Sequence, residues 1–143
     1  MEVKIQDDTT LDLFQNTGHF LSVKIFPEKE MIEYHWTSFA PFETLVEAYL
    51  VVGRFLRQHH YTIAKGLNDL SQTEGSFDEH NEWMTKVYLP KAIERGYRCT
   101  AFVKSADLFA QLALDFFLDN NPEGHTFEVF EDAEEAKKWL ENQ

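Results

Sequence analysis

The chain has 143 residues, with 25 acidic against 13 basic side chains and a formal net charge of −12. That length suits one domain, which buries roughly 68–70% of its unfolded surface on folding. Nucleic acids and anionic membranes are disfavoured as partners, because both are bound through clusters of Lys and Arg. The sequence shows no apolar run of membrane-spanning length and no signal peptide, so we expect a cytoplasmic protein that does not insert into membranes.

The single cysteine, Cys99, has no partner for an internal disulfide. It lies in the apolar run 97–103, where a small buried hydrophobic residue is the natural interpretation. This cysteine usage fits a reducing compartment.

The first 18 residues are polar and weakly patterned, and we interpret residues 1–18 as an N-terminal extension with one candidate edge strand at 3–5. Residues 19–26 and 31–36 then alternate between apolar and polar side chains around a turn at Pro27. They predict an antiparallel hairpin. An exposed edge strand in this hairpin would permit a homodimer, and the sequence leaves monomer and dimer open.

Helices and strands alternate through the rest of the chain. Pro41 opens the first helix, where its missing N–H has no cost. A strand is expected over residues 61–67, and a second helix begins at Ser76, which makes a capping box with Glu79. Pro90 lies inside the second helical pattern and predicts a kink or a break there.

The last third of the chain repeats the strand–helix unit. A strand over residues 97–103 leads to a third helix capped by Asp107, and a strand over 127–130 leads to the C-terminal helix. Asp132 can accept a hydrogen bond from a free N–H in the first turn of that helix, and Glu135 can reach back as in a capping box.

The predicted order is therefore ββαβαβαβα, which is an α/β domain over residues 19–143. Strand–helix–strand units imply parallel pairing with right-handed crossovers, and the opening hairpin adds an antiparallel neighbour. We expect a mixed, mostly parallel sheet of about five strands.

This order resembles the STAS fold of anti-sigma-factor antagonists and, more closely, the small stand-alone bacterial SpoIIAA-like proteins. It is distantly similar to CRAL-TRIO lipid-carrier domains. The resemblance covers roughly residues 19–141. The motifs that carry it are the hairpin ending in Trp36, the turn Asn68–Ser71, Glu82-Trp83 and Leu89–Ile93 of the second helix, the turn Lys104–Phe109, and the tail Phe130–Leu140.

The resemblance implies a non-enzymatic regulatory module that binds a protein partner. In anti-sigma-factor antagonists, a Ser or Thr at the start of the helix after the third strand is phosphorylated, and the phosphate breaks the partner interface. Ser76 occupies that place here, and Asp69, Ser71 and Phe77 complete the candidate interface or phospho-switch. The double hydroxyl and the following glycine of the family's motif are missing. An N-cap is the alternative role of Ser76, and a hydrogen-bonded loop hydroxyl that of Ser71.

No catalytic signature is present in the sequence. Walker, GxGxxG and nucleophile-elbow patterns are absent, and the acidic segment 66–85 has no Lys or Arg to pair with a phosphate. The six histidines show no spacing typical of a zinc site. We therefore expect no enzymatic activity, no cofactor and no metal.

Aromatic residues are unusually frequent, at 15% of the chain, with 13 Phe. The third helix and the strand before it predict a Phe-rich core, an apolar pocket between that helix and the sheet, or an exposed patch for a partner. The pocket candidates are Phe102, Phe109, Leu112, Phe116 and Phe117. The alternative function is therefore a carrier or sensor of a small apolar, lipid-like ligand.

Overall fold

The computed structural model describes residues 1–74, 78–107, 114–115, 119 and 123–143. Its strands are β1 (Glu2–Asp7), β2 (Thr10–Gln15), β3 (Gly18–Phe26), β4 (Met31–Trp36), β5 (Lys65–Asp69), β6 (Cys99–Val103) and β7 (Thr126–Phe130). Its helical segments are the 3-10 turn η1 (Pro27–Lys29), α1 (Phe42–Gln58), α2 (Asp78–Trp83), the π-helical turn η2 (Met84–Tyr88), α3 (Leu89–Glu94) and α5 (Ala133–Glu141). Within these ranges, no helix combines the length and the apolar character needed to cross a bilayer.

The strands form one mixed sheet in sequence order, β1 to β7. The first three pairings are antiparallel and the last three, from β4 to β7, are parallel. The α/β class and the mixed sheet are confirmed. The expected five-stranded, mostly parallel sheet is corrected to seven strands, because the chain begins with an antiparallel meander before the crossovers start.

The two additional strands come from residues 1–18, where the sequence pattern indicated an extension. Leu11 and Leu13 are fully buried in β2, while Asp12 between them lies on the opposite face. Burial of two leucine side chains contributes roughly 1.5–3 kcal/mol each, which is enough to fix β2 onto β3. Only two apolar residues alternate here, so the period-2 signal was too short to recognise.

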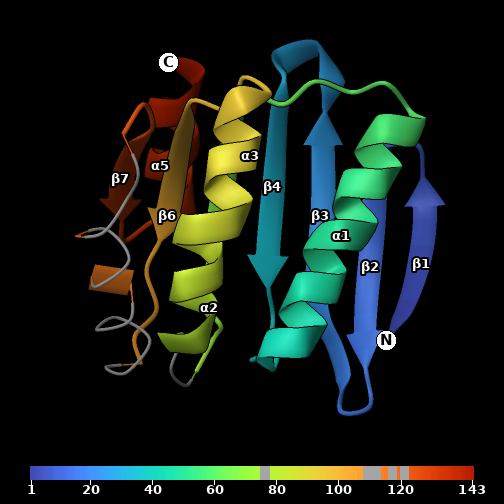
Figure 1. Cartoon of the computed structure of the whole chain (residues 1–143). Coiled ribbons are helices and arrows are strands. Elements are labelled where there is room, and N and C mark those ends of the chain that lie inside the picture. The colour runs from blue at the N-terminus through green and yellow to red at the C-terminus, as the bar shows by residue number, and fades with distance from the viewer. Residues whose placement is uncertain (75–77, 108–113, 116–118, 120–122) are drawn as a thin grey trace.

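The face of the sheet that is turned to the viewer in Figure 1 carries α1, α2, η2 and α3. Helix α1 buries one stripe against β2, β3 and β4, because its apolar residues recur every three or four positions. The stripe consists of Leu45, Ala48, Tyr49, Val52 and Phe55. The second helical segment shares this face and packs on β5 and β6 through a smaller cluster around Leu89 and Phe102.

Helix α5 covers the opposite face of the parallel strands (Figure 1). Its Ala136 and Leu140 are fully buried against Leu67 and Ala101. The predicted N-cap is confirmed, since the Asp132 carboxylate accepts a hydrogen bond of 2.8 Å from the Glu134 N–H. The helix therefore locks the C-terminal half of the sheet from behind.

On this same rear face, the antiparallel half of the sheet is polar. The strand register aligns Lys4, Asp12, Ser22, His35 and Asp69 in one row across β1 to β5. Directly paired residues point to the same side of a sheet. The two faces thus differ in chemistry, with apolar packing under α1 and a polar row behind it.

Strand β5 begins later than the pattern predicted, at Lys65 rather than Tyr61. Residues 61–64 connect α1 to the sheet, and the Ala64 N–H donates to the Glu30 carbonyl at 2.7 Å. Asn68 was expected in a loop but lies in β5, where its side chain accepts a hydrogen bond from the Trp36 indole at 3.0 Å. That bond satisfies the polar amide inside a strand.

Gly66 allows the ring of Tyr97 to lie directly over β5. A Cβ at this position would overlap the Tyr97 hydroxyl. Gly66→Ala is therefore expected to lower the free energy of unfolding by about 1–3 kcal/mol in urea titrations, through overpacking.

Tyr97→Phe provides the matched control, because it removes the overlapping oxygen. The Gly66→Ala/Tyr97→Phe double variant should lose less stability than the sum of the two single variants. Equal urea midpoints for the wild type and Gly66→Ala would contradict the close approach.

Candidate functional site

A groove of about 380 Å³ opens between α1 and the α2–η2–α3 segment. Figure 1 shows these two helical walls side by side on the same face of the sheet, with β4 between them. We call it the aromatic groove. It is lined by Tyr49, Leu50, Gly53, Leu56 and Arg57 of α1, by Trp83, Val87, Tyr88, Lys91, Ala92 and Arg95 of the second wall, by Ile32, Tyr34 and Tyr97 of the floor, and by Tyr61, Thr62 and Ile63 at one end.

Four aromatic rings join the two walls to the floor. The Tyr49 ring lies 4.5 Å from Tyr88, 5.9 Å from Trp83 and 5.2 Å from Tyr34 between ring centroids. Trp83 and Tyr88 stack at 5.8 Å on the second wall. Rings in such contact are pre-ordered, so a ligand that packs on them finds surfaces already in place.

The π-helical turn η2 explains how Trp83 and Tyr88 come to stack. In an α-helix, residues five apart do not share a face. Here the Leu89 N–H donates to the Met84 carbonyl, five residues earlier. The wider turn brings both rings to the groove. Pro90 follows at once, with no N–H to donate and a ring that clashes with a regular α-helical carbonyl, which accounts for the irregularity. The sequence predicted a kink or a break at Pro90; the structure shows instead a π turn directly before it, and the helical backbone continues into α3.

The hydroxyls of Tyr34, Tyr49 and Tyr88 are uncharged at any physiological pH. Burial raises the pKa of Tyr34, Tyr49 and Tyr88 above the ordinary value. A hydrogen bond links the Tyr34 and Tyr88 hydroxyls. It raises the pKa of Tyr34 further and partly offsets the rise in the pKa of Tyr88. These three hydroxyls are therefore neutral polar groups in a mainly apolar lining.

The mouth of the groove exposes two apolar side chains, Leu50 at 57% and Val87 at 39%. Its described lining contains no His, Cys, Asp or Glu, the residues that most often transfer protons or attack substrates.

A second, smaller cavity of about 60 Å³ lies beside the carboxyl ends of β4, β5 and β6. Its described lining includes Trp36, Asn68, His80 and Phe102, and Tyr49 borders both this cavity and the aromatic groove. This cavity is several times smaller than the aromatic groove. Of the predicted pocket residues, Phe102 is placed here, buried and stacked on Phe127 at 5.7 Å.

Several predicted site residues lie outside the described residues. These are Ser76 and Phe77 of the candidate switch, and Phe109, Leu112, Phe116 and Phe117 of the candidate pocket. The apolar pocket expected between the third helix and the sheet therefore stays a prediction.

Asp69 and Ser71 form a tight turn at the carboxyl end of β5. The Asp69 carboxylate accepts hydrogen bonds from the Ser71 backbone N–H at 3.0 Å and from its hydroxyl at 2.6 Å. This is the hydrogen-bonded loop hydroxyl that the sequence offered as the alternative role of Ser71. Both residues lie at the edge where ligands of parallel sheets commonly bind, but they do not line either cavity described above.

His35 is held between two carboxylates on the polar rear face. Its Nδ1 lies 3.4 Å from Asp69 Oδ2, and its Nε2 lies 2.9 Å from Glu33 Oε1. Hydrogen bonds to Asp69 and Glu33 raise the pKa of His35 to about 9, and the His35 contact lowers that of Asp69 to about 2. Within the described ranges, no three His, Cys, Asp or Glu side chains are placed to hold a metal ion. This cluster is an ion-pair network across β4 and β5.

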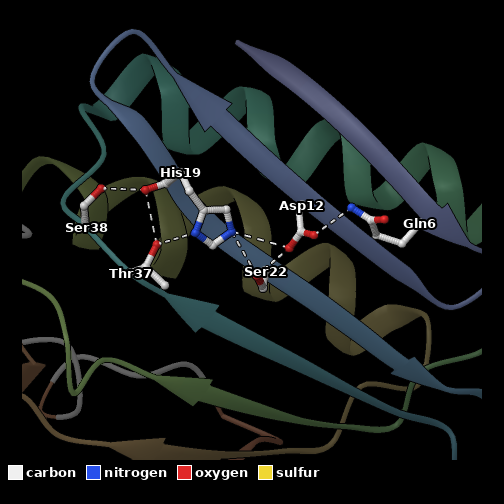
Figure 2. Close-up of polar contacts among 6 residues, drawn as sticks. All are labelled: Gln6, Asp12, His19, Ser22, Thr37 and Ser38. Carbon is white, nitrogen blue, oxygen red and sulfur yellow. Dashed lines mark hydrogen bonds and ion pairs between the residues drawn. The ribbon is translucent and has the colours of Figure 1, made fainter.

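A neighbouring network joins β1 to the residues that follow β4 through Asp12, His19 and Ser22 (Figure 2). The Ser22 hydroxyl donates to Asp12 Oδ1 at 2.6 Å, and His19 Nε2 lies 2.9 Å from Ser22 Oγ and 3.4 Å from the same carboxylate oxygen. His19 Nδ1 faces the Thr37 hydroxyl at 2.8 Å, and Gln6 donates to the other Asp12 oxygen at 3.0 Å.

The residue types match a Ser–His–Asp triad, but their connections do not. In a catalytic triad the histidine lies between the serine and the aspartate, with one ring nitrogen facing each. Here one nitrogen of His19 faces both Ser22 and Asp12, and the serine proton is held by the carboxylate. The hydrogen bond from Ser22 is also the main reason why the pKa of Asp12 is lowered. The network therefore links strands rather than preparing a nucleophile.

The aromatic groove is the functional feature that the sequence pattern missed. Tyr49 was recognised as part of an apolar helical stripe, and Trp83 and Tyr88 as apolar residues of the second helix. Their meeting depends on two helical segments that are separated in the sequence by the loop and strand between Gln58 and Asp78, which no local pattern reports. The one local sign of the irregular helix that brings Trp83 and Tyr88 together was Pro90.

No protein-family model, curated protein or solved structure matches the chain significantly.

The His35 network predicts a pH-dependent contribution to stability. Because its folded-state pKa of about 9 exceeds the ordinary value of 6.5, the imidazolium stabilises the fold fully below about pH 6.5. This contribution is lost as the pH rises through about 9. The side chain is 33% exposed, so the contribution is of the order of 1 kcal/mol, or about 2–4 °C in Tm.

His35→Gln is accordingly expected to lower Tm at pH 6 and to change it much less at pH 10, as measured by differential scanning calorimetry. His60→Asn, at an exposed helix end, is the control and should shift Tm by a similar amount at both pH values. A loss of Tm in His35→Gln that is the same at pH 6 and pH 10 would contradict the ionised network.

Proposed function

We propose that the protein is a non-enzymatic binding module that holds a small molecule with an apolar body in the aromatic groove. The observation that carries this proposal is the groove itself, whose volume of about 380 Å³ falls in the range of small-molecule sites. It combines a mainly apolar, aromatic surface with a few tyrosine hydroxyls, which is the usual composition of such sites.

The groove also has the features of a site that is formed before its ligand arrives. Tyr34 and Tyr49 are 3% and 7% exposed, so their rings are fixed by packing. The exposed Leu50 and Val87 at the mouth leave apolar surface that a ligand would cover. Burial of that surface would supply roughly 25 cal/mol per Å² of binding free energy before the cost of association.

Gly53 offers a way to close the groove without damaging the fold. It lies in the wall formed by α1, and a Cβ there would meet only the mobile tip of Arg57, at 3.3 Å. Gly53→Leu should fill the groove, abolish ligand retention, and raise helix stability by about 1 kcal/mol relative to glycine. Native mass spectrometry of protein purified without detergent should show an additional apolar mass on the wild type and none on Gly53→Leu.

Gly53→Ala is the matched control, because it makes the same backbone change and the same contact with Arg57 but extends little into the groove. It should retain the ligand. A bare wild-type mass, together with no binding of the neutral probe N-phenyl-1-naphthylamine, would overturn the proposal.

We propose as a second candidate a regulatory, protein-binding module of SpoIIAA-like, STAS type. The observation that favours it is the exposed Ser71, held by Asp69 at the carboxyl edge of the parallel strands, next to the segment in which Ser76 lies. A cytoplasmic, bacterial setting and a homodimer paired along the edge strand β1 belong to this proposal. Support comes from the free, buried Cys99 and from the position of β1 at one margin of the sheet.

Under this second proposal, Ser76→Asp should reduce recovery of a protein partner in a pull-down from native lysate, since an added negative charge mimics phosphorylation. Ser71→Asp tests the turn itself, and Thr17→Asp, in the exposed turn between β2 and β3, is the control for added charge. Equal recovery of every partner by wild type and Ser76→Asp would count against the switch.

A further inference from the structure

We infer that the ligand of the aromatic groove is an amphipathic anion, with an aryl or acyl body and a carboxylate or similar oxyanion at one end. This inference rests on the proposed binding function and specifies the class of molecule. It starts from an imbalance of charge. The chain carries 25 acidic and 13 basic side chains, yet the described lining of the groove holds three basic residues and no acidic one.

The three cations are Arg57 on one wall and Lys91 and Arg95 on the other. Lys91 and Arg95 are four residues apart, so they share one side of the second wall. Arg57 lies in the last turn of α1, and Arg95 is the C-cap of α3. Figure 1 shows the C-terminal ends of these two helices at the same end of the sheet, at the top of the view. The positive charge therefore gathers toward one end of the groove.

Trp83, Tyr88 and Tyr49 lie farther from the helix C-termini than the basic residues, whereas Tyr61 and Tyr97 lie beside Arg57 and Arg95. Trp83 and Tyr88 precede Lys91 along the second wall, and Tyr49 precedes Arg57 by two helical turns on α1. All three basic residues thus lie toward one end of a groove whose surface is otherwise mainly aromatic and aliphatic. A molecule with an apolar body and an anionic head matches that arrangement.

The cationic groups are not committed to other charges within the described part of the chain. Lys86 and Lys104 form ion pairs with Glu82 and Glu131, but no described carboxylate lies within 4.0 Å of Arg57, Lys91 or Arg95. The exposed hydroxyl of Thr62 lies at the same groove and adds a neutral donor. Arginine binds oxyanions through two parallel hydrogen bonds, so two arginines and a lysine can hold a carboxylate.

This arrangement also decides against a cationic ligand. Aromatic rings such as Tyr49 and Trp83 attract quaternary ammonium groups in other proteins. Three cations at the same groove repel such a molecule. Basic residues near helix C-termini also interact favourably with the helix dipole, which is the competing explanation for their placement. If the helix dipole alone explains these basic residues, their removal should lower the stability of the protein without changing its preference between anionic and neutral ligands.

Two fluorescent probes that share one aromatic body separate these explanations. 8-Anilinonaphthalene-1-sulfonate carries a negative charge, and N-phenyl-1-naphthylamine is its neutral counterpart. The wild type should bind the sulfonate at least about tenfold more tightly at low salt, and the preference should shrink as salt screens the charges. Arg57→Gln/Lys91→Gln/Arg95→Gln should lose this preference and keep its affinity for the neutral probe.

A control variant with the same change of net charge is Arg54→Gln/Lys86→Gln/Lys138→Gln, in which all three side chains lie outside the groove lining. It should keep the preference for the sulfonate. Equal binding of both probes by the wild type, or an equal loss of preference in the two triple variants, would overturn the anionic head while leaving the groove as a binding site. If neither probe binds the wild type, and Gly53→Leu does not change the mass that the protein retains in native mass spectrometry, the proposed function itself is overturned.

Discussion

The ring of Tyr49 contacts four other aromatic rings, and these contacts join the sheet to both helical walls. Tyr34 and Trp36 approach it from β4, at 5.2 and 6.0 Å between centroids. Trp83 and Tyr88 approach from the second wall, at 5.9 and 4.5 Å. Because aromatic contacts of this kind are directional as well as apolar, they fix the separation of α1 from the second helical segment. The groove exists because this packing holds the two walls apart at their exposed edges while joining them at the floor.

The two faces of the sheet therefore have different roles. The helical face gathers aromatic and aliphatic side chains and leaves a concave surface between its layers. The rear face of β1 to β4 is instead crossed by hydrogen bonds and ion pairs around Asp12 and His35. Those polar links hold the strands of the antiparallel half in register, where no described helix lies behind them. Residue types that suggest chemistry thus serve the architecture, while the more ordinary apolar residues form the candidate site.

Local patterns predicted much of the fold, and the reasons for the failures are physical. The alternation in β3 and β4, the stripe of α1 and the cap at Asp132 are properties of short segments, and each was recognisable in the sequence. Strand β2 was missed because only Leu11 and Leu13 alternate. The site was missed because it depends on the distance between two helices. Arg57, Lys91 and Arg95 are scattered along an acidic chain, and only the crossover topology brings them to one groove.

The π turn at Met84–Tyr88 contains one residue more than a regular helical turn would need. In an α-helix each residue adds about 100° of rotation, so removal of one residue would return the segment to regular geometry and turn Trp83 away from Tyr88. The buried stripe of α1 and the strands would be untouched by that event. A one-residue deletion in this turn would therefore remove the stacked pair of rings from the groove while the sheet and the buried stripe of α1 keep their packing.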